Sequence, residues 1–364
     1  MRPTNCRGDD NCKAFDKVPH SRLFNKLEFY GIHGSLLRWI KNFLTDRLQQ
    51  VIIDNNRSDS CYVLSGVPQG TVLAPLLFLI YINDLPLHVS SKIRLYADDV
   101  ILYLNICSMA DCRRLQNDLD SLMQWSHKWQ MHFNPRKCEF LRITNKKSFL
   151  PFSYYINDCL IQEVSHARYL GVILDQHLSW NEHIKQIANK ATKVNAFLYR
   201  NLYQCPPLVK SNVYKAMVRP IMEYSSTIWD PHTLVNINRL ESVQKHAARM
   251  CFKNYSRFSS ISSMLANLNL PTLQERRNRA KLQMLYKIIH QLVAIPDNCL
   301  TPIPSYLRSG YFNQLNTNID CFKYSFFPSS IKLWNHLPPT ITNTATYTKF
   351  CKELDNYYNH TCAL

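Results

Sequence analysis

Apolar side chains near the start of the chain recur at the spacing of two short helices. The leucine and aromatic positions that follow Pro19 fit one helix face, and those in residues 36–44 fit a second. Gly31 and Gly34 separate the two runs, and glycine interrupts helices. The pattern therefore predicts two consecutive helices between Pro19 and Thr45.

A β-type pattern follows these helices. Residues 50–54 and 61–64 are rich in Val, Ile and Tyr, and the polar residues 55–60 separate them. Such runs on either side of a polar loop predict a hairpin. The second run leads directly into the segment Ser65-Gly66-Val67-Pro68-Gln69-Gly70.

Farther along, mixed patterns give way to long helices. Ser108 with Asp111 predicts a capped helix that ends near Asn134-Pro135, and short β-type runs follow in residues 139–143, 152–156 and 169–174. Beyond Trp180, long basic amphipathic helices are predicted at 183–199 and 273–292. We therefore expect an α+β domain in residues 1–179, a helical domain in 180–292 and a tail in 293–364. Aromatic and aliphatic residues would anchor the tail: Phe326, Phe327, Ile331 and Trp334.

The chain is strongly basic, and its charge is unevenly distributed. Among 364 residues, 43 are Lys or Arg and 26 are Asp or Glu, which gives a formal net charge of +17. Residues 181–290 alone hold 17 Lys and Arg against 5 Asp and Glu. A merely soluble basic protein is the plain alternative, but an excess confined to a helical segment favours a polyanionic partner such as nucleic acid.

The pattern argues against several other kinds of protein. The 13 cysteines lack the rhythm of a disulfide framework and no signal peptide opens the chain, so we expect reduced thiols and an intracellular location, in nucleus or cytoplasm. No spacing of Cys and His predicts a zinc site. The longest apolar run, residues 72–82, is shorter than the roughly 20 residues that span a bilayer, so no membrane role is expected.

Two adjacent acids lie inside the most regular β-type segment, residues 92–104. If Asp98 and Asp99 are the central residues of a tight turn, the facing pairs are apolar: Ala97 with Val100, Leu95 with Leu102, and Ile93 with Leu104. The opposite face would then carry Arg94, Tyr96, Ile101 and Tyr103. Adjacent carboxylates repel each other unless a cation lies beside them, so the hairpin predicts a divalent metal at its tip.

On its own, an Asp-Asp pair would most often be a structural turn dipeptide. Two other segments change this interpretation. Residues 10–16 supply further carboxylates ahead of a helix, and residues 65–70 form a loop before an apolar run. Phosphoryl transfer by two metal ions needs carboxylates from separate elements that converge on ions about 3.5–4 Å apart. Asp10 and the turn acids meet that requirement.

Five segments occur in a fixed order along the chain: Asp10-x-x-Lys13-Ala14-Phe15-Asp16, Ser65-Gly66-Val67-Pro68-Gln69-Gly70, Tyr96-Ala97-Asp98-Asp99, Asn134-Pro135-Arg136-Lys137-Cys138 and Tyr169-Leu170-Gly171-Val172. In this order they resemble the palm motifs of reverse transcriptases from non-LTR (LINE-type) retrotransposons. Residues 326–338 resemble a tail common in jockey-like and CR1-like elements. The resemblance implies a right-hand polymerase, with an antiparallel palm sheet packed on helices, an α-helical thumb and a C-terminal tail.

The resemblance also implies a metal site. Asp10 would bridge two Mg²⁺ ions with Asp98, and Asp99 would support the cluster; Mn²⁺ is the alternative ion. The substrates would be an RNA template, a DNA primer and deoxynucleoside triphosphates. Lys137 matches a lysine that protonates the leaving pyrophosphate, and a solvated surface lysine is the equal alternative.

Four more residues are assigned to nucleotide or template by the resemblance. Phe15 would block a ribose 2′-hydroxyl, although from the sequence pattern alone it would be core. Gln69 and Gly70 would contact the template and the incoming base pair. The alternative is that they belong to an ordinary loop with no role in binding. Tyr96 belongs to the same group.

The start of the chain departs from the family pattern. The residues before Asp10 are polar where the family has an apolar strand, and nine residues cannot hold the fingers. We therefore expect an N-terminally truncated reverse transcriptase whose activity depends on how Asp10 is held. One alternative is a non-catalytic relic that binds nucleic acid through basic helices, including Arg276-Arg277-Asn278-Arg279. Another is a metal-dependent nuclease, which would degrade nucleic acid without added nucleotides.

Overall fold

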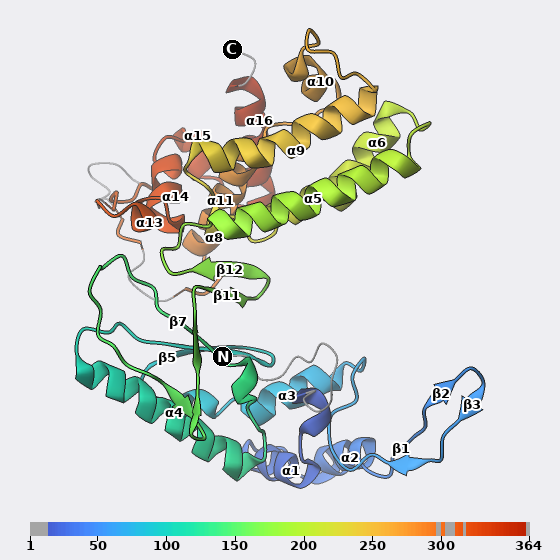
Figure 1. Cartoon of the computed structure of the whole chain (residues 1–364), viewed down its shortest axis with the longest axis vertical. Helices are drawn as coiled ribbons and strands as arrows, with labels where there is room; N and C mark the ends of the chain where they lie inside the picture. The colour runs from blue at the N-terminus through green and yellow to red at the C-terminus, as the bar shows by residue number, and fades with distance from the viewer. Residues whose placement is uncertain (1–13, 296–299, 303–309, 316–317, 362–364) are drawn as a thin grey trace. The chain divides into compact units, whose positions relative to one another are not determined.

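The computed structural model describes residues 14–295, 300–302, 310–315 and 318–361. Two compact units make up the chain, Met1–Gly171 and Val172–Leu364 (Figure 1). Each unit has its own hydrophobic core, and mixed helices and strands in the first unit are followed by a mainly helical second unit. The first unit contains, in order, η1 (Ala14–Lys17), α1 (His20–Phe29), α2 (Gly34–Leu44), β1 (Leu48–Gln49), β2 (Ile52–Ile53), β3 (Asn56–Arg57), β4 (Cys61–Tyr62), α3 (Leu73–Ile82), η2 (Leu85–His88), β5 (Lys92–Tyr96), β6 (Asp99–Tyr103), α4 (Met109–Trp129), η3 (Pro135–Lys137), β7 (Glu139–Leu141), β8 (Tyr155–Ile156), β9 (Cys159–Leu160), β10 (Gln162–Val164) and β11 (His166–Tyr169).

The two predicted helices at the start of the chain are confirmed as α1 and α2. Leu23 and Leu27 of α1 are fully buried, one turn apart, and Leu37, Ile40 and Leu44 form the buried stripe of α2. The predicted breaks are confirmed too, because both intervening glycines have positive φ. This spacing alone fixes which faces enter the core.

A lysine is buried among aromatic rings where α1 meets α3 and α4. The Nζ of Lys26 lies 3.9 Å from the ring centre of Trp129, 4.8 Å from Trp125 and 4.9 Å from Tyr81. It also forms an ion pair of 2.5 Å with Asp84. Burial nevertheless lowers the pKa of Lys26 to about 8, against the smaller opposing effect of Asp84.

The predicted hairpin after α2 is present, but its turn is tighter than expected. Ile53 pairs with Asn56, so the turn residues are Asp54 and Asn55, and part of the expected loop is strand. Both turn residues have positive φ, a conformation that Asp and Asn tolerate better than most residues. All of residues 48–62 are exposed, and Figure 1 shows β2 and β3 projecting beyond α2 as an arm.

The apolar run at residues 72–82 forms α3, a helix that is buried on one side. Leu77, Phe78 and Tyr81 are almost completely buried, whereas Leu76 and Leu79 are about half exposed. Nowhere in the described ranges is a helix long and apolar enough to cross a membrane.

The predicted capped helix is confirmed as α4, and it fixes the entry to β5. Ser108 and Asp111 form a reciprocal capping box, and the helix ends at Trp129, a few residues earlier than expected. On its inner side, the Asp118 carboxylate accepts hydrogen bonds of 2.8 Å from the backbone N–H groups of both Ser90 and Ser91. Burial is the largest single effect and would raise the pKa of Asp118, but the hydrogen bonds from Ser90 and Ser91 together lower it.

The strands of the described residues pair only two by two, so the single antiparallel sheet expected for this unit is not seen as one continuous sheet. β1 pairs with β4, β2 with β3, β5 with β6 and β8 with β9, all antiparallel, whereas β7 and β10 are parallel. Short strands of two to five residues cannot support a wide sheet, and helices supply most of the core.

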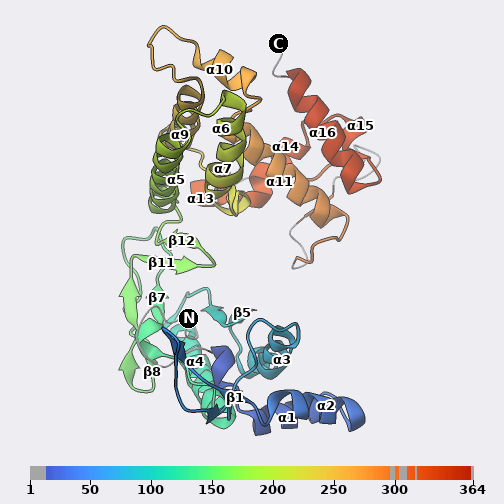
Figure 2. The same ribbon diagram turned by 90° about the vertical axis from the view of Figure 1, so that its right-hand side faces the viewer.

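The second unit is mainly helical, as the basic amphipathic pattern predicts. Its elements are β12 (Val172–Asp175), α5 (Asn181–Asn201), α6 (Pro207–Val213), the π-helix η4 (Tyr214–Val218), α7 (Arg219–Glu223), α8 (Ser226–Trp229), α9 (Leu234–Phe252), α10 (Ile261–Asn267), α11 (Leu273–Ile289), α13 (Asp320–Lys323), α14 (Phe326–Trp334), α15 (Pro339–Thr342) and α16 (Tyr347–Thr361). Figures 1 and 2 both show α5 and α9 as long neighbouring helices, whose buried residues share one core.

The last helices pack on α11 around a separate cluster of buried side chains. Ile331 and Trp334 of α14 are buried with Leu282 and Tyr286 of α11, and Phe350 of α16 stacks on Tyr286 with 4.4 Å between ring centres. The final segment is therefore docked through the residues that the sequence singles out.

Candidate active site

The two adjacent acids lie at the tip of the β5–β6 hairpin, but the turn is one residue earlier than predicted. Tyr96 pairs with Asp99, so the turn residues are Ala97 and Asp98. The predicted pairs are therefore wrong: Leu95 pairs with Val100 and Ile93 with Leu102. Asp98 lies in the turn itself, and Asp99 is the first residue of a strand.

The predicted faces are nevertheless correct. Moving the turn by one residue changes each partner by two positions, and side chains two apart on a strand share a face. Ile93 and Val100 are buried on the inner face, while Tyr96, 65% exposed, and Tyr103 lie on the outer face. Ala97 takes a φ of 49°, which costs a residue with a Cβ about 1–2 kcal/mol, so the surrounding contacts must stabilise this turn.

The two carboxylates are electrostatically unfavourable together. Burial raises the pKa of Asp98, and the negative charge of Asp99 raises it further. Neither acid forms an ion pair with any residue that the structure describes. Tyr169 of β11 is close enough that the charge of Asp99 adds to the effect of burial in raising the Tyr169 pKa.

This donor set suits a divalent cation. A bound cation would offset both effects that disfavour ionised Asp98, and hard carboxylate oxygens are the ligands that Mg²⁺ prefers. Within the described ranges, no group of three or more His, Cys, Asp or Glu residues could hold a metal ion. Asp10, the third acid of the predicted set, lies outside the described residues.

The Ser65–Gly70 loop is docked on η1 by backbone contacts. The N–H of Val67 donates to the carbonyl of Phe15 at 2.7 Å, and the N–H of Gly66 donates to that of Val18 at 2.8 Å. The Ser65 hydroxyl donates to the carbonyl of Asp16 at 2.9 Å. Two segments about 50 residues apart in sequence, both singled out as candidate site segments, are thus held side by side.

Two side chains complete this contact. The Gln69 amide nitrogen donates to the Asp16 carboxylate at 3.0 Å, and the ring nitrogen Nε2 of His20 lies 2.8 Å from the carbonyl oxygen of Gly66. The Gln69 side chain is exposed in spite of this bond, so part of its amide faces solvent.

The glycines of the loop have different structural roles. Gly66 and Gly70 both have positive φ, +89° and +85°. A Cβ on Gly66 would lie 2.6 Å from the Asp16 Cα, whereas a Cβ on Gly70 would meet no heavy atom within 4 Å. Close packing of two backbones therefore requires glycine at 66, and only backbone conformation favours it at 70.

η1 and the β5–β6 hairpin line one apolar cavity. Its lining includes Ala14 of η1, Phe78 of α3, and Ala97 and Val100 of the hairpin. Phe15 is half-buried and stacks on Phe78, with 4.3 Å between ring centres and 18° between planes. Ala14, in the segment that begins with Asp10, is therefore held close to the turn that carries Asp98.

Lys137 occupies a different element. It ends η3, where the Asn134 side chain accepts a hydrogen bond from the N–H of Arg136, and it is partly buried.

The sequence did not reveal three residues that shape this region: Asp16 as the partner of Gln69, His20, and Gly66 as the obligatory glycine. The sequence gives no indication of a partner for Asp16, and nothing in it distinguishes Gly66 from Gly70. A histidine at the first position of α1, three residues after η1, gives no periodic signal, so only the folded backbone identifies its partner.

The basic run at the start of α11 is not available to a ligand in the way the sequence suggests. Arg277 is 1% exposed and forms a 2.6 Å ion pair with Asp230, and Lys281 pairs with the same carboxylate at 2.5 Å. Arg279 pairs with Glu275 and Asp355. The prediction that these arginines bind nucleic acid is wrong, because their guanidinium groups form ion pairs within the unit.

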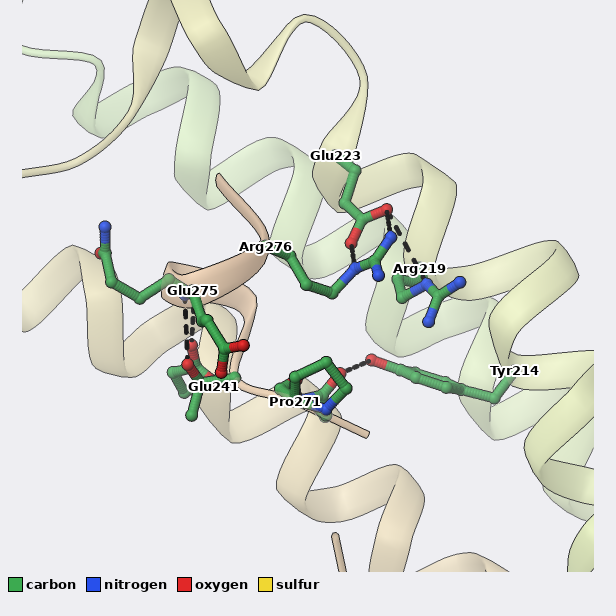
Figure 3. Close-up of polar contacts among 10 residues, drawn as sticks. Tyr214, Arg219, Glu223, Glu241, Pro271, Glu275 and Arg276 are labelled. Carbon is green, nitrogen blue, oxygen red and sulfur yellow. Dashed lines mark hydrogen bonds and ion pairs between the residues drawn. The ribbon is translucent and has the colours of Figure 1, made fainter. Parts of the chain in front are cut away.

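Arg276 belongs to a neighbouring polar network. Figure 3 shows Glu223 between Arg276 and Arg219. The hydrogen bond that Arg276 donates to the Glu223 carboxylate raises the pKa of Arg276, whereas burial lowers the pKa of Arg219. Nearby, Glu241 accepts a bond of 2.9 Å from the N–H of Gln274 at the start of α11, and burial raises its pKa.

A group of exposed basic side chains in this unit lies on α5 and α9 instead. Both helices carry exposed basic side chains, whereas their acids are fewer: Glu241 is buried, and Glu182 is half-buried and lies 3.8 Å from the Lys185 ammonium. The exposed cations are Lys185, Lys190, Lys193 and Arg200 on α5 and Arg239 and Lys245 on α9. Just beyond the ends of these helices, Lys253 lies 3.8 Å above the ring of Tyr203, which is 49% exposed.

Comparison with known proteins gives a consistent result. Residues 10–174 match the family described as reverse transcriptase (RNA-dependent DNA polymerase). The chain is 29% identical over 296 residues to a probable RNA-directed DNA polymerase from transposon BS of Drosophila melanogaster, covering 74% of this chain and 31% of that protein. It is 31% identical over 251 residues to an RNA-directed DNA polymerase from mobile element jockey of Drosophila funebris, covering 65% and 27%. The chain thus spans less than a third of the length of these relatives.

Proposed function

Since residues 10–174 form a domain of the reverse transcriptase family, similar to those of non-LTR retrotransposons, we propose that this chain catalyses RNA-templated addition of deoxynucleotides to a primer 3′-hydroxyl. One observation carries the proposal. η1, the Ser65–Gly70 loop and the acid-bearing hairpin, each predicted to contribute to a polymerase site, are packed together within one unit.

Asp98 and Asp99, with Asp10, would hold two Mg²⁺ or Mn²⁺ ions. Bound there, the ions would lower the pKa of the primer hydroxyl and neutralise charge on the triphosphate. The protein's part is to fix the carboxylates: backbone pairing with Tyr96 orients Asp99, and the inner-face contacts of Val100 hold the turn that bears Asp98. A cation bound there would offset the burial that raises the pKa of Asp98.

The remaining site residues are assigned by position. Phe15, stacked on Phe78, would face the nucleotide sugar with its open edge, and Gln69 and Gly70 would contact the template and the incoming base pair. Tyr96, exposed on the outer face of the hairpin, would contact the nucleotide or the template, and Lys137 would protonate the leaving pyrophosphate. In this assignment residues 1–179 are the palm without most of the fingers, 180–292 the thumb and 293–364 the tail.

The thumb would bind the primer–template through α5 and α9. Their exposed cations outnumber the two acids of these helices, and such a surface attracts the phosphate backbone regardless of sequence. The aromatic ring of Tyr203 beneath Lys253 adds a face on which an unpaired base can stack.

Primer extension tests this proposal directly. The full chain, a DNA primer on an RNA template, deoxynucleotides and Mg²⁺ should give products that disappear when the metal is chelated. Asp98→Asn keeps the size of the turn side chain but removes its charge, so extension should fall at least a hundredfold while binding of primer–template is retained. Equal extension by wild type and Asp98→Asn would refute the assignment.

The second candidate is a non-catalytic nucleic-acid-binding protein, and the exposed basic faces of α5 and α9 favour it. It predicts salt-sensitive binding, without extension, that Asp98→Asn leaves unchanged. Replacing Lys190 and Lys193 by Gln should then weaken binding and flatten its dependence on salt concentration. A metal-dependent nuclease would instead shorten the primer when no nucleotides are present.

A further inference from the structure

Exposed aromatic and basic side chains gather where α5 and α9 end. Both helices end on the same side of the second unit (Figure 1). Tyr203 follows α5, and Tyr255 and Phe258 lie in the loop that joins α9 to α10. The exposed fractions of these three side chains are 49%, 47% and 99%. We call the surface formed by Tyr203, Lys253, Tyr255 and Phe258 the aromatic tip.

Contacts between the two helix ends hold most of the aromatic tip in place. The Lys253 ammonium lies 3.8 Å from the ring centre of Tyr203, and the rings of Tyr199 and Tyr203 meet edge to face with 5.8 Å between their centres. Tyr255 lies beside the same rings, since Tyr199 and Tyr203 add to the effect of burial in raising the pKa of Tyr255. Rings that are already packed against one another lose little conformational freedom when a ligand binds.

The chain around the aromatic tip is free of acids. Residues 183–222 and 242–274 contain no Asp or Glu, and they include every segment that forms the tip. Arg200, Lys253 and Arg257 are exposed there. These cations have no carboxylate in their own segments to neutralise them, so the tip attracts an anionic ligand.

Interleaved cations and exposed rings suit a strand of nucleic acid whose bases are unpaired. The cations attract phosphates, and the rings stack on bases whose faces are open. In a duplex each base face is covered by the next base pair, so the rings would find few faces to stack on. The tip therefore differs from the part of α5 that carries Lys190 and Lys193, where charge alone can bind a duplex.

We propose that the aromatic tip is a binding site for single-stranded nucleic acid, in which Tyr203 and Phe258 stack on unpaired bases and Lys253 binds phosphate. This inference rests on the nucleic-acid binding of the proposed function but not on its catalysis, because stacking needs neither nucleotides nor metal ions. Stacking does not depend on the sugar, so an RNA strand and a DNA strand share this chemistry.

Equilibrium binding to the full chain, in a chelator and without nucleotides, tests the site. The probes are fluorescent oligo(U) and oligo(dT) of about 12 nucleotides and a DNA duplex of the same length. Tyr203→Leu and Phe258→Leu keep an apolar side chain but remove the ring. Each should weaken binding of the single strands by about five- to tenfold and change duplex binding less than about twofold. Phe258 is almost fully exposed, so its replacement leaves the fold intact.

Two controls separate stacking from charge and from general effects of losing a ring. Lys190→Gln removes an exposed charge and should weaken binding of all three probes alike. Phe29→Leu removes an exposed ring in the first unit and should change none of them. If only oligo(U) or only oligo(dT) is bound more weakly by the tip variants, that probe identifies the kind of strand that the site holds.

Several outcomes would overturn the inference. It is wrong if Tyr203→Leu and Phe258→Leu leave single-strand binding unchanged, or if they weaken duplex binding equally. It is also wrong if they weaken binding to vesicles of anionic phospholipid but not to the oligonucleotides, because the tip would then be a membrane surface. Primer extension by the same proteins keeps the two proposals apart. A chain that extends no primer but shows the expected binding pattern would refute the proposed activity and leave this site standing.

Discussion

Replacing Gly66 by alanine tests whether the loop and η1 are held together by direct backbone packing. The added Cβ would lie 2.6 Å from the Cα, 2.7 Å from the carbonyl oxygen and 2.8 Å from the carbonyl carbon of Asp16. All three are backbone atoms, which cannot rotate away as a side chain can. The loop must therefore move outward, and the hydrogen bonds from Gly66 and Val67 to Val18 and Phe15 must lengthen or break.

The size of the effect follows from comparison with Gly70. Both positions have positive φ, so alanine costs about 1 kcal/mol of backbone conformation at either one. At Gly70 nothing more is lost, because the new methyl group enters open space. At Gly66 the overlap adds about 1–3 kcal/mol, as overpacking of a well-packed site does. We expect Gly66→Ala to destabilise loop docking by about 2–4 kcal/mol and Gly70→Ala by about 1 kcal/mol.

Hydrogen exchange measured by mass spectrometry on peptides that span residues 60–75 checks this difference. Each 1.4 kcal/mol changes an equilibrium tenfold, so protection of the Gly66 and Val67 amides should fall about 30- to several-hundredfold in Gly66→Ala and about fivefold in Gly70→Ala. Peptides from α9 serve as an internal control and should not change. Equal loss of protection in both variants would show that backbone conformation, and not close packing, requires glycine at 66.

Two further predictions concern buried charges. The pKa of Lys26 is lower in the folded chain than in the unfolded chain, so the unfolded state binds more protons between pH 8 and 10.5. The free energy of unfolding should therefore rise with pH in this range, by up to about 3 kcal/mol relative to Lys26→Met. Parallel pH profiles of the two proteins in urea unfolding would contradict this. Asp230→Ala leaves Arg277 and Lys281 buried without their shared partner, so thermal unfolding should show the second unit destabilised by about 3–5 kcal/mol. Glu182→Gln is the control: it breaks the more exposed pair with Lys185 and should change the stability by less than about 1 kcal/mol.

The features that the sequence predicted well depend on local periodicity. Helical spacing located α1, α2, α5 and α11, and alternation identified the inner face of the β5–β6 hairpin. The same alternation could not locate the turn, because moving it from Asp98-Asp99 to Ala97-Asp98 leaves every side chain on its predicted face. The register depends on which residue accepts a positive φ, and here it is Ala97, which has no special propensity for it.

The features that the sequence missed depend on partners distant along the chain. Arg277 and Asp230 are 47 residues apart, and Gln69 and Asp16 are 53 residues apart. A run of arginines has the same composition whether it faces solvent or a buried carboxylate, so charge counting predicted a basic surface at α11 that the fold uses internally. The distinction between Gly66 and Gly70 has the same origin, since it depends on a backbone that arrives from η1.

The projecting arm has a practical consequence for anyone who concentrates this protein. Among the residues that the structure describes, its strands β2 and β3 pair only with each other, and Val51, Ile52 and Ile53 are each more than 60% exposed. A two-stranded ribbon with two open edges and apolar side chains is a template for strand addition between molecules. Self-association should therefore begin at this arm. Replacing Ile52 and Ile53 by threonine keeps the β-propensity of the strand but lowers its apolar exposure, so these are the first substitutions to make for solubility.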